Sequence, residues 1–319
     1  MMLLIYHRYH LFYQLMDRFP KRILNRNKIP LDNKALRILF SVFCIAGLII
    51  SQDLSCKTPF PARGYAKILT DEEALLRLNN YRSFLIRDLN QTQFHYAYAF
   101  QFRLRHMPFR GDESFERGII YGMAPGHSLS RIDLDSGQSF LLQNGTKPKI
   151  WVFNAKTNKI SSVSEGKLFE PIVGGMNHTL FDILMPFVFW DGVYLKSGKV
   201  AGRPAHLFSF RIPDWVNQIK PNLTEIVMAL DKSYEAPLRV ESYENRNVPS
   251  KTYILNSVKK VEDNWIVKSI DCKNRLDRSA TRFEVLSAAF NLDLDLSLFS
   301  VGGLMNRPKV SVDSFISTQ

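Results

Sequence analysis

The chain has 319 residues, enough for one large domain or two modest ones, and its apolar, charged, glycine and proline contents exclude a mostly disordered protein. The net charge is +12, but residues 1–37 alone carry +6, and the remaining basic excess is too diffuse to indicate a nucleic-acid partner. Only three cysteines occur, and none lies in a cluster with metal-ligand spacing, which argues against a disulfide scaffold and a zinc site. We therefore expect no metal and no cofactor.

The first 67 residues have the composition of a targeting region. Residues 1–37 are basic and aromatic and are predicted to be a cytoplasmic leader. Residues 38–51 hold an apolar run, broken by Ser41, that follows a charged flank; this is typical of a signal peptide and short for a membrane span. Residues 52–67 contain Pro59 and Pro61 and are predicted to be a linker. We expect export to the periplasm, and a cleaved signal, a retained membrane anchor and a buried helix remain alternatives for the apolar run.

Cys56 offers a further alternative. Asp53-Leu54-Ser55-Cys56 is similar to a lipoprotein box, in which the cysteine is acylated, although the leucine lies one position closer to the cysteine than in that motif. Lipidation of Cys56 is therefore a candidate modification.

An amphipathic helix is predicted next, over residues 71–89. Thr70 and Glu73 have the spacing of a capping box at its start. Apolar residues then recur at spacings of three and four, which places them on one stripe of a helix. The stripe consists of Ala74, Leu78, Tyr81, Leu85 and Leu89.

The segment 94–106 is the most informative strand of the chain. Tyr96, Tyr98, Phe100, Phe102 and Leu104 fall on one parity, whereas small, polar or charged residues fall on the other. Because side chains alternate across a strand, one face is an aromatic and aliphatic wall. Such a wall needs an apolar partner, which could be a packed core, a ligand cavity or lipid.

The rest of the chain continues with period-two segments separated by turn residues, with no long helix between them. This pattern is typical of an antiparallel meander in a sandwich or barrel. The predicted strands span residues 114–123, 127–134, 139–143, 149–154, 193–198, 205–212, 225–231, 237–243, 251–261, 265–274 and 282–287. A short helix is predicted within 291–305, and a flexible tail over 306–319.

One apolar segment interrupts this pattern. Asn177-His178-Thr179 can cap a short helix over 180–185, which Pro186 ends. Residues 180–190 are the most apolar stretch of the domain. The segment is expected to be either a plug in the core or a lid that contacts a ligand.

Several motifs resemble a known family. Asn144-Gly145 followed by Trp151-Val152-Phe153-Asn154 resembles a strand pair of the LolA/LolB lipoprotein-carrier superfamily. The run from Asp182 to Trp190, together with 202–206, 232–239, 265–268 and 277–283, is similar to bacterial outer membrane lipoprotein-sorting proteins. The resemblance covers roughly residues 68–300 and implies that residues 68–305 form a mainly β (α+β) domain, a half-open antiparallel β-barrel with an N-terminal amphipathic helix and a short helical lid or plug.

The resemblance also implies a function. A protein of this family shelters acyl chains in a hydrophobic barrel cavity during outer-membrane lipoprotein sorting in the periplasm. Its partners would be lipoprotein or lipid acyl chains and membrane-associated donor and acceptor proteins, and it would act as a monomer. The acyl-binding residues would be Tyr96, Tyr98, Phe100, Phe102, Leu104, Trp151, Phe153, Phe181, Leu184, Phe187 and Trp190. The family's lid arginine, which precedes a proline, is absent, because that place reads Met123-Ala124-Pro125.

Three other classes of protein match the sequence less well. The histidines of the domain lie on separate strands and loops, and no nucleophile elbow or phosphate loop occurs, so we expect no enzyme. The long amphipathic helix and the helical insertion argue against a transmembrane β-barrel. A non-carrying module that senses lipid or binds partners in an envelope complex remains the alternative.

Overall fold

The computed structural model describes residues 4–5, 66–85, 96–124, 128–244 and 247–318. The chain falls into two units, and all described residues belong to the first, which comprises residues 1–6 and 63–319. The predicted leader, the apolar run 38–51, Cys56 and most of the predicted linker lie outside the described residues. Among the helices that are described, none is long and apolar enough to cross a membrane.

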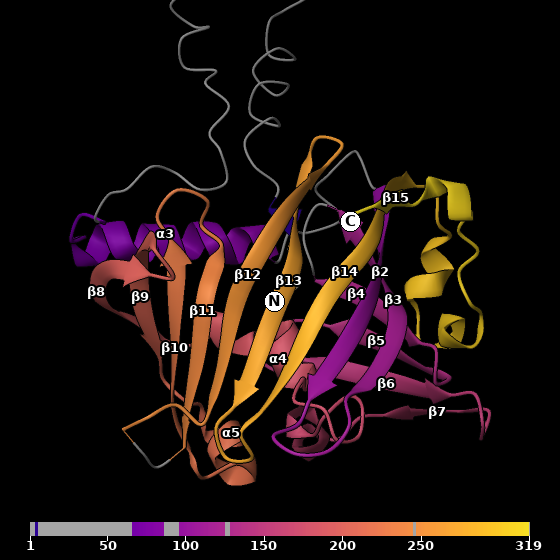
Figure 1. The fold of residues 1–319 in the computed structure, drawn as a ribbon, viewed down its shortest axis with the longest axis horizontal. Helices are drawn as coiled ribbons and strands as arrows, with labels where there is room; N and C mark the ends of the chain where they lie inside the picture. Colours follow the sequence, from indigo (N-terminus) through magenta and orange to yellow (C-terminus); the bar gives the residue numbers. More distant parts are fainter. Residues whose placement is uncertain (1–3, 6–65, 86–95, 125–127, 245–246, 319) are drawn as a thin grey trace, which may run out of the picture. The chain divides into compact units, whose positions relative to one another are not determined.

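A single antiparallel sheet of 15 strands forms the domain (Figure 1). Its main path runs β7-β6-β5-β4-β3-β2-β14-β13-β12-β11-β10-β9-β8, so β7 and β8 are the two edges and the sheet is not closed. The strands are β1 (Leu4–Ile5), β2 (Tyr96–Met107), β3 (Ser114–Ala124), β4 (Leu129–Leu134), β5 (Gln138–Gln143), β6 (Lys149–Asn154), β7 (Lys159–Ser162), β8 (Gly192–Val200), β9 (Arg203–Phe210), β10 (Leu223–Asp231), β11 (Pro237–Glu244), β12 (Lys251–Val261), β13 (Asn264–Asn274), β14 (Ser279–Leu292) and β15 (Ile316–Ser317). The mainly β class and the open antiparallel sheet that the sequence predicts are confirmed.

Two meanders, β2–β7 and β8–β14, are joined where β2 pairs with β14 (Figure 1). Phe102 lies opposite Val285, and Leu104 lies opposite Phe283. Both strands are long and present large apolar residues to one side, which favours their pairing. The joint makes the aromatic wall of β2 the middle of the sheet.

The predicted helix forms as α3 (Asp71–Leu85). Its capping box is present, because the backbone N–H of Thr70 donates to Glu73 (3.0 Å) and that of Glu73 donates to the Thr70 hydroxyl (3.2 Å). The described part of the predicted stripe, Ala74, Leu78, Tyr81 and Leu85, is buried. The helix packs over β8: a Cβ at Gly192 would lie 2.9 Å from Leu78.

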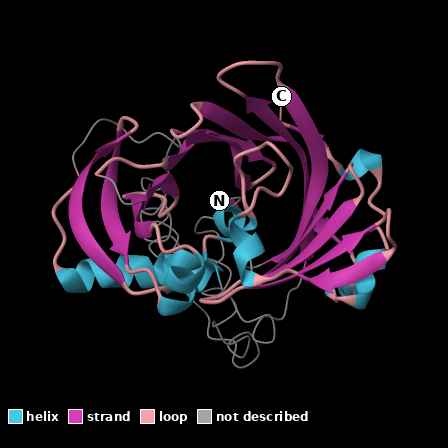
Figure 2. Cartoon of the chain, turned by 90° about the horizontal axis from the view of Figure 1, so that it is seen from below, coloured by secondary structure: helices cyan, strands magenta, loops and turns pink. Residues whose placement is uncertain are grey.

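The sheet buries apolar residues on both faces. We call the face that carries Phe100 the inner face, and Figure 2 shows the strands bent around one side of the sheet. The inner face contributes to the main hydrophobic core together with the stripe of α3. On the opposite, outer face, Ala97, Ala99 and Tyr121 belong to a second cluster, and Leu207 and Val227 belong to a third.

The C-terminal segment covers the second cluster. Phe299 and Leu304 come from η4 (Leu296–Phe299) and η5 (Gly302–Met305) and are buried there. The fully buried Arg131 of β4 donates to the carbonyls of Leu298, Gly303 and Leu304 and pairs with Asp133 at 2.8 Å. One buried guanidinium thus fastens this segment to the sheet.

Other elements differ from the sequence prediction. The short strand β7 and the helix α5 (Asp214–Ile219) were not predicted, because four and six residues give little periodicity. Two 3-10 helices replace the expected helix in 291–305, since β14 extends to Leu292. The residues expected to form a flexible tail are held in place through 318: β15 pairs with β14, and Thr318 is buried with its hydroxyl on the carbonyl of Val285 (2.6 Å).

Candidate functional site

The aromatic wall of β2 has the predicted parity. Tyr98, Phe100, Phe102 and Leu104 are all buried on the inner face. Their rings continue into β14, where Phe102 lies 5.2 Å from Phe283 and Phe100 lies 5.9 Å from Phe290. Tyr96 begins the same strand, and its side chain lies outside the described part of the chain.

Glycines of the neighbouring strand make room for this wall. Gly122 and Gly118 of β3 lie directly opposite Tyr98 and Phe102. A Cβ on Gly122 would collide with the Tyr98 ring, and one on Gly118 would lie 2.9 Å from Phe102 and closer still to the Asp133 carbonyl. The glycines therefore leave the space that the Tyr98 and Phe102 rings occupy.

The apolar interruption of the meander, residues 177–190, lies on this inner face, and we call it the insertion. It forms α4 (Leu180–Leu184) and η3 (Pro186–Phe189). Met185 between them has a φ of 49°, a left-handed conformation that ends α4 and redirects the chain. The predicted residues of the insertion, Phe181, Leu184, Phe187 and Trp190, are buried in the same core as the wall.

The insertion has an aromatic cluster of its own. The rings of Phe181 and Trp190 are 5.8 Å apart, and Phe187 lies 5.3 Å from Phe210 of β9. Trp190 also contacts Trp215 of α5 at 6.1 Å. In this structure the insertion covers the wall, so the wall is not exposed to solvent.

Trp151 and Phe153 are not brought together with the other predicted residues. They lie on the outer face and pack against the second cluster, with Phe299 and Leu304. Their strand neighbours Ile150 and Val152 face the inner core instead. Both parities of β6 are apolar, so alternation alone did not tell which one faces inward.

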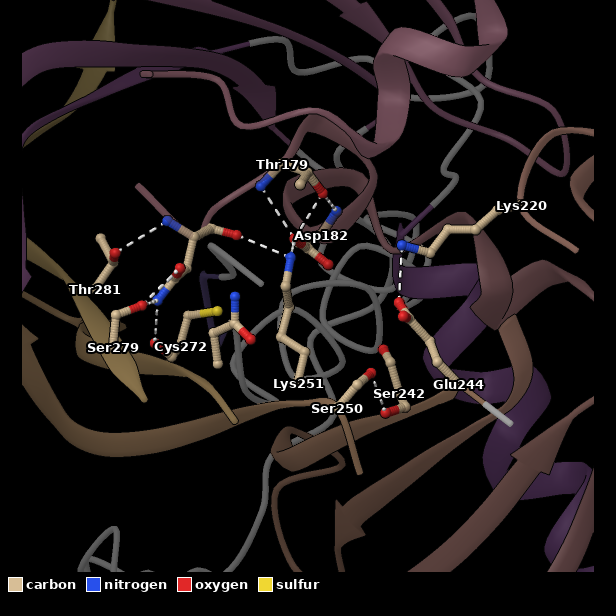
Figure 3. A network of polar contacts seen from close by, with 12 residues as sticks. Thr179, Asp182, Lys220, Ser242, Glu244, Ser250, Lys251, Cys272, Ser279 and Thr281 are labelled. Atoms are coloured by element: carbon tan, nitrogen blue, oxygen red, sulfur yellow. Dashed lines mark hydrogen bonds and ion pairs between the residues drawn. The ribbon is translucent and has the colours of Figure 1, made fainter. Parts of the chain in front are cut away.

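A buried ion pair holds the start of the insertion (Figure 3). Lys251 of β12 donates to the Asp182 carboxylate at 3.1 Å and to the Asn177 carbonyl at 2.9 Å. The Thr179 hydroxyl donates to the same carboxylate at 2.6 Å. The capping box of α4 is formed by the Thr179 backbone N–H, which donates to that carboxylate at 3.0 Å, and by the Asp182 N–H, which donates to the Thr179 hydroxyl at 3.1 Å. Although burial opposes it, the Lys251 ammonium and the Thr179 hydroxyl lower the pKa of Asp182.

Asn177 connects the insertion to β13 and β14. Its backbone N–H donates to the Thr281 hydroxyl (3.0 Å), and its side chain bonds Ser279 (3.0 Å) and the Cys272 carbonyl (3.4 Å). The Thr281 hydroxyl also contacts His106 of β2 at 2.8 Å. These histidine and hydroxyl groups serve as packing contacts, and among the described residues no group of three could hold a metal.

The end of the insertion is held by α3. Arg82 donates to the carbonyls of Val188 (2.7 Å) and Trp190 (2.6 Å). The turn after β5 adds two more contacts, from the Asn144 amide to the Leu184 carbonyl and from the Trp190 indole to the Thr146 carbonyl, each at 2.9 Å. An arginine thus binds the insertion in this protein. It comes from α3 and not from the position before Pro125, where the related carriers are expected to have their lid arginine.

Sequence reasoning missed Arg82, Lys251 and Asn177 as parts of the site. The capping-box spacing of Thr179 and Asp182 was a usable signal for the start of α4. No local pattern distinguishes Lys251 from the other lysines of its strand, because its role depends on a partner 69 residues away.

A family model described only as "-like: Uncharacterized protein" matches residues 131–306, more than half of the chain. The chain belongs to this family. The match includes the insertion, Lys251 and the segment that Arg131 fastens. No curated protein matches the chain.

Solved structures share the fold of this family member. A putative outer membrane lipoprotein-sorting protein domain from Vibrio parahaemolyticus has a TM-score of 0.61 at 16% identity, covering 74% of this chain and 100% of that one. A DUF1329 family protein from Desulfovibrio piger has a TM-score of 0.58 at 14% identity, covering 72% and 98%. A LolA superfamily protein from Nitrosomonas europaea has a TM-score of 0.52 at 14% identity, covering 71% and 97%.

These likenesses establish a LolA-like open β fold for the chain. None of the three proteins is named as an enzyme.

Proposed function

We propose that the protein is a lipid carrier of the cell envelope that binds acyl chains on the inner face of its sheet. The observation that carries the proposal is the layout of that face: a continuous aromatic and aliphatic wall is covered by the stripe of α3 and by a short insertion that is held at a few polar points. A named lipoprotein-sorting domain with the same fold supports it. In this proposal the insertion is a lid that moves aside for the acyl chain.

The free energy gained by burying the insertion is comparable with that gained by burying an acyl chain in its place. Each large apolar side chain contributes about 1.5–3 kcal/mol when buried, so the four of the insertion contribute roughly 6–12 kcal/mol. An acyl chain of about 15 methylenes contributes about 12 kcal/mol at about 0.8 kcal/mol each. One chain can therefore offset the exposure of the insertion, and a second would make the exchange favourable.

The finer role follows the family resemblance. The proposed cargo is lipoprotein or lipid acyl chains, and the proposed place is the periplasm, after export by way of residues 38–51. Donor and acceptor proteins at the two membranes would load and unload the carrier. Tyr98, Phe100, Phe102 and Leu104 form the proposed acyl site with the insertion, whereas Trp151 and Phe153 face away from it.

A second candidate is a module that binds envelope partners without carrying lipid. The observation that favours it is that the residues of the wall are buried together with those of the chain's own insertion. The two candidates differ in whether lipid ever enters.

Lipid binding separates them. We expect the purified protein to yield acyl chains on extraction and mass spectrometry, or to take up a fluorescent fatty-acyl probe. Phe100→Asp should abolish uptake because it places a charge on the wall, whereas Phe100→Met should retain it. Phe115→Asp is the matched control, since Phe115 is 54% exposed on β3.

Circular dichroism would verify that each variant is folded. Uptake by folded Phe100→Asp would contradict the assignment of the acyl site. A wild-type protein that neither contains nor takes up lipid would overturn the carrier proposal and favour the partner-binding module.

A further inference from the structure

Lys251 has an unusual environment for a lysine. Its side chain is 22% exposed, and it leaves β12 toward the start of the insertion (Figure 3). Both acceptors of its ammonium, the Asp182 carboxylate and the Asn177 carbonyl, belong to the insertion. Among the ion pairs of the described residues, the pair with Asp182 is the only one that involves Lys251.

The sheet itself offers this ammonium little compensation. The Tyr253 ring lies 5.9 Å from it, and Cys272, opposite Tyr253 on β13, takes part in the network through its carbonyl. The neighbouring Glu244 is already paired with Lys220 at 2.8 Å. A mostly buried charge without a partner is costly. A ligand that replaces the insertion therefore binds more tightly if it brings a negative charge to Lys251.

Tyr253 adds a second group to the same place. Positions 251 and 253 point to one face of β12. Burial raises the pKa of the Tyr253 hydroxyl well above its ordinary value, and the adjacent Asp182 carboxylate adds to this effect. A neutral hydroxyl and an ammonium side by side are donors suited to an anion.

The insertion itself resembles such a ligand. Asp182 supplies a carboxylate, and the neighbouring Phe181, Leu184 and Phe187 supply the apolar part that lies in the main core. Its chemistry is that of an anionic head group attached to a hydrocarbon tail.

We propose that Lys251 and Tyr253 form the head-group site for a lipid with an ionised carboxylate or phosphate, which displaces Asp182 when an acyl chain displaces the insertion. This inference rests on the proposed lipid-carrier function. It assigns a ligand class: anionic rather than neutral acyl lipids.

A matched pair of probes tests the charge preference. Fluorescent palmitic acid and its methyl ester share one hydrocarbon chain and differ in charge. Wild-type full-length protein should bind the acid about tenfold or more tightly than the ester, the range of a hydrogen bond to a charged group. Asp182→Asn should increase the affinity for the acid more than that for the ester, because it removes the competing carboxylate in addition to a contact that holds the insertion.

The double variant Asp182→Asn with Lys251→Met is expected to fold, since it leaves no unpaired buried charge. It should bind the acid and the ester equally well and so lose the preference for the acid. Lys220→Met is the matched control, because Lys220 pairs with Glu244 and not with the insertion, and it should keep the preference.

Two further arms identify the source of the anion. Lysophosphatidic acid compared with monoacylglycerol tests a phosphate head group. Inorganic phosphate alone should displace neither palmitic acid nor lysophosphatidic acid. Equal binding of acid and ester by the wild type, or a preference that survives in the double variant, would overturn this inference while leaving the carrier function intact. Failure of every lipid to bind would overturn both.

Discussion

Single residues of the inner face carry buried polar groups that make stability depend on pH. His178, at the start of the insertion, is buried between Tyr253 and Phe283. Burial lowers its pKa to about 4; Asp182 opposes the shift, and Lys251 adds to it. At neutral pH the imidazole is therefore uncharged, and it acts as an apolar ring in the core.

The lowered pKa predicts acid sensitivity. A histidine in the unfolded state has a pKa of about 6.5, so between that pH and about pH 4 the unfolded state binds a proton that the folded state does not. The contribution of His178 is fully present above this window and is lost as the pH falls through it, by up to about 3 kcal/mol. Urea unfolding at pH 7 and pH 4.5 would measure the loss.

His178→Phe is the comparison for this prediction, because phenylalanine preserves the ring and cannot be protonated. The free energy of unfolding of the variant should fall less between the two pH values than that of the wild type. His206 also has a pKa lowered to about 4, chiefly by burial, and contributes equally to both proteins. An identical fall in both would show that His178 does not titrate as the geometry predicts.

At the scale of elements, α3 and the insertion act as one unit. Arg82 is the link, since it donates to two insertion carbonyls from the last turn of the helix. Arg77 lies one turn earlier and binds the Lys232 carbonyl and Glu235 instead. Arg82 thus binds α3 to the insertion, whereas Arg77 binds α3 to the segment around Lys232.

We predict that Arg82→Met loosens the insertion. Two charge-assisted hydrogen bonds are lost, so amide hydrogen exchange over 180–190 should become about tenfold faster or more, and uptake of an acyl probe should be faster. Arg77→Met should leave exchange in 180–190 unchanged. Equal protection of the insertion in Arg82→Met and the wild type would show that its apolar contacts alone hold it.

At the scale of the whole described domain, both faces of one sheet need covers. The insertion and α3 cover the inner face, and η4 with η5 covers the outer face around Tyr121. The outer cover depends on Arg131, whose guanidinium is fully buried. A sheet with two apolar faces is stable only if both covers remain in place.

Removal of residues 295–319 should therefore expose the outer cluster. We predict a lower melting temperature, a loss of about 3 kcal/mol or more in the free energy of unfolding, and binding of a hydrophobic dye. Val312→Ser, on the same segment but 80% exposed, is the control and should have no effect. A truncated protein with unchanged melting would mean that the segment does not stabilise the sheet.

Much of this architecture was predictable from local pattern. The capping box and stripe of α3, the parity of β2 and the approximate positions of most strands follow from spacings within a few residues. The burial of the insertion followed from its composition. Short or polar elements such as β7 and α5 were missed because they have too few residues to show a period.

The alternation of apolar and polar residues determined that this chain forms an antiparallel sheet with one aromatic face, because side-chain direction along a strand is a local property. Only the tertiary structure decided that β2 pairs with β14, that Trp151 faces outward while Ile150 faces inward, and that Lys251 meets Asp182. These facts depend on contacts between residues far apart in the chain, where either face of an apolar strand and any of several lysines would satisfy the local pattern equally well.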